Sequence, residues 1–153
     1  MLCEYHAYAM VPARDLERAR RFYEDVLGFE PMKVNDAGVQ YNARGSVIYL
    51  YKSTFAGTNM ATTLSIEIDD DLGPLVAQLR RRGVRFEEYN LPDAGIKTLD
   101  GIFTYESGSN AWFKDTEGNI IGLVKAVEPM EWPADEVLVA AGGGSSLDPF
   151  EDF

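Results

Sequence analysis

Cysteine and histidine are nearly missing from this chain of 153 residues, which has one of each, Cys3 and His6. A single cysteine excludes an intrachain disulfide and suits a reducing compartment. A single histidine leaves a catalytic metal site short of donors, because such sites generally use at least three protein ligands. The sequence therefore predicts neither a disulfide framework nor a histidine-rich metal centre.

Long apolar runs and a surplus of basic residues are also missing. No apolar run approaches the roughly 20 residues that a membrane helix needs. The N-terminus has no basic stretch followed by an apolar run, so no signal peptide is expected. Lys and Arg number 14 against 25 Asp and Glu, for a formal net charge of −11, which argues against nucleic-acid binding. We therefore expect a cytoplasmic protein that contacts neither a membrane nor a nucleic acid.

The chain contains one pattern of secondary structure twice. In the first copy, residues 5–11 have strand character, and Asp15 and Gly28 are suited to cap and end a helix. Three short strands follow near residues 29–33, 39–43 and 47–52. In the second copy, a strand over residues 62–68 alternates apolar and polar side chains, and a helix ends at Gly83. Further strands are predicted near residues 84–89, 102–106, 110–114 and 119–125.

This repeat predicts an α+β fold of two tandem βαβββ modules, at about residues 4–52 and 60–127. Side by side, two such modules form a curved eight-stranded mixed sheet. We expect its convex side to carry the helices and its concave side to form a cup, the usual place for a small ligand.

Charge and composition change after residue 127. The segment 128–153 has seven acidic residues and no Lys or Arg, whereas the first 127 residues have 18 acids against 14 bases. A Gly/Ser-rich stretch at 142–146 precedes an acidic and aromatic end, which is typical of a linker followed by a peptide. We interpret residues 128–153 as an acidic tail that is either passive or docks on the body or on a partner subunit. The arginine clusters at 18–21 and 80–85 fall on predicted helices, and we interpret them as the solvent-exposed faces of those helices.

Two stretches resemble signatures of the vicinal oxygen chelate superfamily, the group of glyoxalase, bleomycin-resistance and dioxygenase proteins. Residues 11–23, VPARDLERARRFY, with VLGFE at 26–30, are similar to its first strand–helix signature. Residues 111–119, AWFKDTEGN, resemble its last hairpin, with Thr116 where proline is common. The resemblance covers about residues 4–127 and implies the fold, whereas function has to be argued from the site.

Enzymes of this family hold a divalent metal with His and Glu from the first and last strands of each module. Counted from the signatures, the matching positions are His6, Tyr49, Thr63 and Gly122. One position in four carries a good ligand, so the resemblance implies an incomplete metal site. We therefore expect no cofactor and no bound metal.

Strand parity predicts which side chains line the cup. If His6 faces inward, so do the alternate residues of its strand and of the strands that match it. We expect His6 and Glu67 as the candidate acid–base pair, and as ligand-contacting residues Tyr8, Met10, Tyr49, Tyr51, Thr63 and Ser65. From the last hairpin we add Trp112, although parity there does not decide whether Trp112 or Phe113 points inward. Such an aromatic and hydroxyl-rich wall suits a flat or aromatic ligand.

Three functions follow as hypotheses. The first is a metal-free protein that binds a small aromatic or cationic molecule, similar to bleomycin-resistance proteins. The second is a glyoxalase- or dioxygenase-like lyase or isomerase that uses a divalent metal or His6 and Glu67 as acid and base. The third is an interaction domain whose tail contacts a partner. The resemblance also implies a homodimer, while the sequence permits a monomer with its modules paired within one chain.

Overall fold

The first module consists of one helical segment and four strands. In the computed structural model, which describes residues 1–126, a 3₁₀ helix η1 (Leu2–Glu4) precedes strand β1 (Ala9–Ala13). Helix α1 (Leu16–Arg21) continues into a π-helical turn η2 (Phe22–Val26). Strands β2 (Pro31–Val34), β3 (Gly38–Ala43) and β4 (Ser46–Lys52) follow. The Asp15 side chain accepts a hydrogen bond from the Arg18 amide at 3.0 Å, which confirms the predicted N-cap.

The second module has the same plan with one insertion. Strand β5 (Thr62–Glu67) and helix α2 (Leu72–Arg81) are followed by a short excursion through β6 (Asn90–Leu91), a 3₁₀ turn η3 (Pro92–Ala94) and β7 (Ile96–Lys97). Strands β8 (Ile102–Tyr105), β9 (Gly108–Lys114) and β10 (Ile120–Ala126) complete the module. The predicted tail, residues 128–153, lies outside the described residues.

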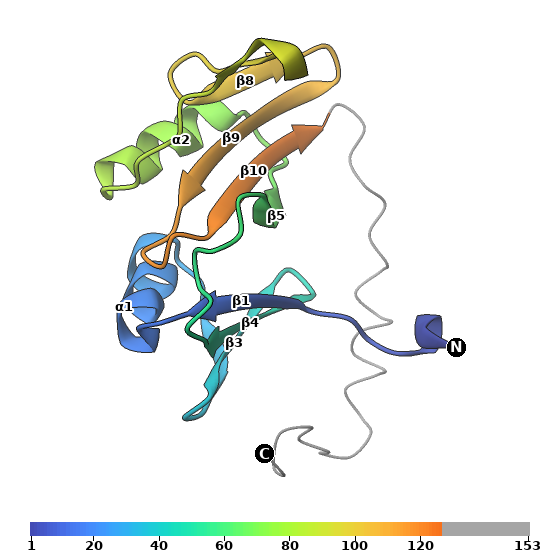
Figure 1. Ribbon diagram of the computed structural model, residues 1–153, viewed down its shortest axis with the longest axis vertical. Helices are drawn as coiled ribbons and strands as arrows, with labels where there is room; N and C mark the ends of the chain where they lie inside the picture. Colours follow the sequence, from blue (N-terminus) through green and yellow to red (C-terminus); the bar gives the residue numbers. More distant parts are fainter. Residues whose placement is uncertain (127–153) are drawn as a thin grey trace.

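Both modules have the same strand order, which confirms the repeat and the α+β fold. The sheets run β1-β4-β3-β2 and β5-β10-β9-β8, and in each the first strand pairs in parallel with the last. The eight strands form two four-stranded sheets rather than one ladder, and the edge strands β1 and β5 lie next to each other (Figure 1). No helix within residues 1–126 has the length and apolar character needed to span a bilayer.

Residues 84–89, predicted as a strand, form only an isolated bridge between Phe86 and Phe113. The Phe86 ring packs edge-on against Phe113 at 5.6 Å, and its partial burial places it with the core of the second module. The apolar character of this stretch therefore serves side-chain packing rather than a backbone ladder.

Each sheet buries one face against its own helical segment (Figure 1). In the first module, Tyr23 packs at 0% exposure with Val11, Tyr41 and Leu50, and its ring stacks on that of Tyr41 at 6.0 Å. In the second module, Val76 and Leu79 of α2 pack with residues of β9 and β10. Phe22 packs against both clusters, so the first module's helical segment also contacts the second core.

The turn between β9 and β10 joins the two modules through buried polar groups. Glu117 has a fully buried side chain that accepts hydrogen bonds from the Arg14 amide at 2.8 Å and the Asp15 amide at 3.1 Å, and pairs with Arg18 at 2.7 Å. Asn119 donates to the Pro12 carbonyl at 2.8 Å. The acidic and amide residues of the last-hairpin signature therefore stabilise the contact between modules.

Candidate functional site

The face of each sheet opposite its helix, here called the open face, carries several of the predicted ligand-contacting side chains, whereas Tyr8 lies before β1 and outside the sheet. In the first module, Met10 lies beside Tyr49, which lies beside Gln40 on the next strand. Tyr49 and Tyr51 stack at 6.5 Å with 6° between their planes. Tyr49 is buried, whereas Met10 is 40% exposed. This open face is therefore an aromatic and thioether surface with a partly accessible edge.

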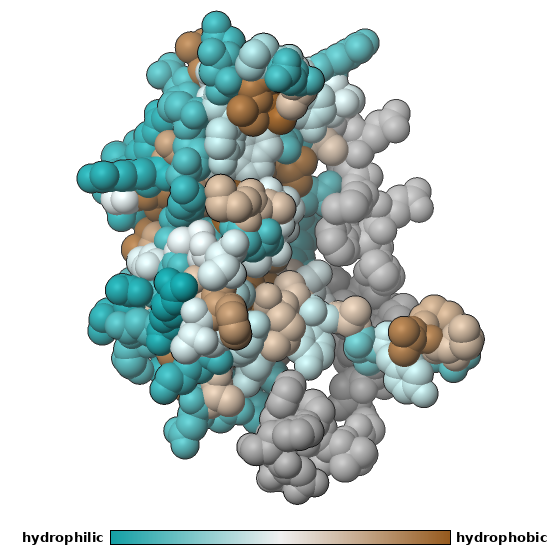
Figure 2. Space-filling model, viewed as in Figure 1, coloured by the Kyte–Doolittle hydropathy of each residue, from teal (hydrophilic) through white to brown (hydrophobic). Residues whose placement is uncertain are grey.

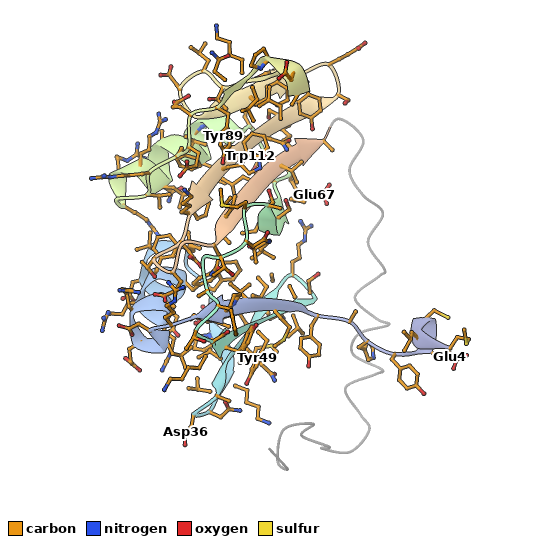
Figure 3. The ribbon with its side chains drawn as sticks, in the orientation of Figure 1. Glu4, Asp36, Tyr49, Glu67, Tyr89 and Trp112 are labelled. Atoms are coloured by element: carbon orange, nitrogen blue, oxygen red, sulfur yellow. The ribbon has the colours of Figure 1, made fainter. Side chains whose placement is uncertain are left out.

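The open face of the second module combines an aromatic pair with polar groups. Ser65, Gly122 and Trp112 lie in register across β5, β10 and β9. The Tyr89 ring packs edge-on against Trp112 at 5.5 Å, and half-buried Glu67 lies two residues beyond Ser65 on β5, opposite Val124. Figure 3 shows Tyr89, Trp112 and Glu67 on this module and Tyr49 on the other. This module therefore carries an indole, a phenol and a carboxylate.

Tyr89 was not among the predicted site residues: it ends a stretch predicted as a strand, but in the structure it lies outside any strand. It follows the bridging Phe86, and its amide hydrogen bonds to the Thr98 hydroxyl at 2.8 Å. Burial, and then the nearby Glu87 carboxylate, raises the pKa of the Tyr89 hydroxyl. This phenol therefore stays neutral at ordinary pH.

His6 lies before the first strand, since β1 begins at Ala9. It is exposed, as are its neighbours Tyr5 and Tyr8, on an N-terminal segment that extends away from the body (Figures 1 and 2). Glu4, on the same segment, lies far from Glu67 in Figure 3. Within one chain, the structure therefore does not bring His6 together with Glu67.

Thr63 occupies an irregular position in β5. Thr62 pairs with Ile120 and Leu64 with Ile121, so Thr63 is an extra residue in a β-bulge. Its hydroxyl is buried and has no hydrogen-bond partner among residues 1–126. The bulge shifts the side-chain alternation, and Thr62 lies beside Gly122. A bulge cannot be recognised from apolar and polar alternation alone, so sequence reasoning missed Thr62.

Gly122 has little room for a side chain. A Cβ atom there would lie 2.9 Å from the Ser65 hydroxyl oxygen, 3.3 Å from Thr62 and 3.5 Å from the Trp112 ring. The space that a glutamate would need at this position is therefore taken by neighbours on the open face.

The donor set does not fit a divalent metal of the kind that the family's enzymes hold. The four matching positions carry an exposed histidine on the N-terminal segment, a buried phenol, a hydroxyl in a bulge and a glycine. Within residues 1–126, no group of three His, Cys, Asp or Glu side chains is placed to bind a metal ion. Neutral phenol and hydroxyl groups are poor ligands for such ions, and Gly122 contributes no side chain.

Two buried acidic side chains, Asp115 and Glu117, lie at the module contact. Burial raises the pKa of Asp115, and hydrogen bonds from Asn119, Tyr23 and the Glu117 amide oppose that rise. Burial and the Asp115 carboxylate raise the pKa of Tyr23 well above its usual range, and the two side chains are joined at 3.0 Å. These groups have structural partners, which argues against a catalytic role for them.

Comparison with known proteins identifies the family. The model for the Glyoxalase/Bleomycin resistance protein/Dioxygenase superfamily matches residues 6–123. No curated protein matches the chain.

Solved structures agree with this fold. One similar structure is a glyoxalase/bleomycin resistance protein/dioxygenase from Alicyclobacillus acidocaldarius, with TM-score 0.61 and 17% identity over 81% of this chain and 92% of that one. Others are a glyoxalase family protein from Enterococcus faecalis (TM-score 0.60, 15% identity, 81% and 99%) and the fosfomycin resistance protein FosX from Listeria monocytogenes (TM-score 0.59, 11% identity, 80% and 93%). At such identities the likeness establishes the fold alone.

Proposed function

Because the chain belongs to the Glyoxalase/Bleomycin resistance protein/Dioxygenase superfamily, we propose that it binds a small organic molecule on its open faces without a metal ion. The proposal rests on the residues at the four positions that match the metal ligands of the family's enzymes. They offer one exposed histidine, two hydroxyl groups and a glycine, while aromatic side chains lie around them. Binding of a drug-like molecule, as in bleomycin-resistance proteins, needs such walls and no ligated ion.

The proposed ligand is flat, aromatic and cationic. Trp112 and Tyr89 supply ring faces and edges for stacking, and indole is the ring that attracts cations best. Glu67 adds a half-buried carboxylate on the same face, and the chain has a net charge of −11. A negatively charged protein concentrates cations near its surface and disfavours anions there.

A homodimer is part of the proposal. Met1 and Leu2 are 91% and 88% exposed, and Tyr5 is 73% exposed, all on the N-terminal segment. Figure 2 shows apolar residues of this segment standing apart from the body. Exposed apolar groups gathered on one segment are typical of an interaction surface. A second copy that covers this segment would also bring His6 towards the other subunit.

Replacing Trp112 with alanine tests the ligand site. With ethidium as the flat cationic probe, we expect the variant to bind at least about tenfold more weakly than the wild type, because a desolvated cation–aromatic contact is lost. Fluorescence anisotropy of the probe gives the affinity. The control is Phe55→Ala, which removes an aromatic ring that is 75% exposed outside the strands and should leave binding unchanged. Equal affinity of wild type and Trp112→Ala, or no binding by the wild type, would contradict this site and ligand class.

A further inference from the structure

A groove of about 390 Å³ lies at the module contact, away from the open faces. It is formed where η2, the segment after α2 and the end of β9 come together (Figure 1). Phe22, Val26 and Val84 provide an apolar floor. The groove is therefore suited to an aromatic or aliphatic side chain of a docked segment.

Basic side chains outnumber acidic ones in the lining of this groove, three to two (Glu87 and Asp115), although the chain has a net charge of −11. The basic ones are Arg82, Arg85 and Lys114. Lys114 lies 3.7 Å from Glu87, and Arg82 donates to the Val26 carbonyl at 3.0 Å. Within residues 1–126, neither Arg82 nor Arg85 forms an ion pair with a carboxylate. Asp115, which also lines the groove, has Tyr23 and Asn119 as its partners. Two arginines on the rim thus remain available to an anionic group.

We propose that the acidic C-terminal end of the chain, residues 148–153, docks in this groove. Its sequence, DPFEDF, alternates carboxylates with two phenylalanines. This composition complements an apolar floor with a rim of arginines, because rings can enter the groove while carboxylates reach the guanidinium groups. The segment after residue 127 has no Lys or Arg, so nothing in it repels the rim.

The length of the chain permits this contact. About 20 residues separate Ala126, the end of β10, from Asp148. A chain of that length can span up to about 70 Å, whereas a folded body of about 126 residues has a radius of gyration near 14 Å. Every part of the body is therefore within reach, and tethering raises the effective concentration of the segment into the millimolar range, on the order of what weak docking requires.

Paramagnetic relaxation enhancement in the full-length chain tests the proposal. A nitroxide is attached to Ser146→Cys in a Cys3→Ser background, which removes the native thiol. We expect selective broadening of the amide signals of Arg82, Arg85 and Thr116. These signals should recover in 1 M NaCl, because the Debye length falls to about 3 Å and salt then screens the attraction between carboxylates and guanidinium groups. Arg85→Glu should abolish the broadening. The control Arg81→Glu makes the same charge change on an exposed side chain that does not line the groove, and should leave it in place.

Three results would overturn the proposal. The first is broadening confined to other regions, such as the open faces. The second is broadening that Arg85→Glu and Arg81→Glu weaken equally, since that indicates attraction by overall charge alone. The third is broadening of a nitrogen-15-labelled chain only by a separate spin-labelled copy, which indicates docking between molecules. Failure of the ethidium experiment leaves this test unaffected, because the groove and the open faces are separate surfaces.

Discussion

Replacing Glu117 with alanine is expected to lower the free energy of unfolding by about 3 kcal/mol or more, since hydrogen bonds to a charged acceptor contribute roughly 1.5–3 kcal/mol each. The carboxylate, whose side chain is fully buried, accepts from the amides of Arg14 and Asp15 and pairs with Arg18, whose own side chain is 48% exposed. Alanine leaves both amide donors without that acceptor. Because a domain of this size is stable by only about 5–15 kcal/mol, urea denaturation followed by circular dichroism should show a clear fall in the midpoint.

The matched control is Glu17→Ala on α1, the helix that carries Arg18. Glu17 is 75% exposed and lies 3.6 Å from Arg20, so its loss should change the free energy of unfolding by no more than about 0.5 kcal/mol. A similar, small effect for both variants would mean that the turn between β9 and β10 does not stabilise the module contact.

Replacing Gly57 with alanine is the second change with a large expected effect. Gly57 has φ +70°, and a Cβ atom there would lie 2.4 Å from the Glu117 carbonyl oxygen and 3.2 Å from the Gly118 α-carbon. Both neighbours are backbone atoms, so they cannot move aside as a flexible side chain would. The substitution should therefore separate this loop from the turn and weaken the hydrogen bond from the Gly57 amide to Asn119.

The variant Gly28→Ala is the control that separates the cost of a left-handed backbone from the cost of the steric clash at Gly57. Gly28 has a similar left-handed backbone, φ +83°, but nothing within 4 Å of a Cβ. Both variants incur the left-handed cost of about 1–2 kcal/mol, and Gly57→Ala should lose about 1–3 kcal/mol more through overpacking. Differential scanning calorimetry of the two variants measures this difference. Equal melting temperatures would show that the loop around Gly57 is not held tightly against the turn.

The repeat and the helix boundaries followed from the sequence because they depend on local signals. Asp15 caps a helix and Gly28 ends the segment with a positive φ, and both signals act within one turn. The β6–β7 excursion was not predicted, since its strands are two residues long and carry no periodicity. The edge strands β1 and β5 lie next to each other without joining the two sheets into one ladder. This arrangement depends on packing between the modules, which a local sequence pattern cannot predict.

The candidate site followed from the sequence only in part. Period-two alternation placed Ser65 on the open face but left undecided which of Trp112 and Phe113 shares it. In the structure, Ser65, Gly122 and Trp112 lie in register. The same reasoning assumed that the first strand extended to His6, whereas β1 begins at Ala9. It also could not anticipate the bulge at Thr63 or the approach of Tyr89 to Trp112, because both depend on contacts between distant segments.

Native mass spectrometry of protein purified without chelator or metal-affinity resin tests the central proposal most directly. It reports the number of subunits, any bound metal ion and any retained small molecule from the same spectrum. Metal-independent ligand binding predicts a dimer with no stoichiometric divalent ion, whose mass increases by that of ethidium when the probe is added. A stoichiometric divalent ion, retained by the wild type and lost in His6→Ala, would contradict the account and assign the open faces to a metal-dependent enzyme.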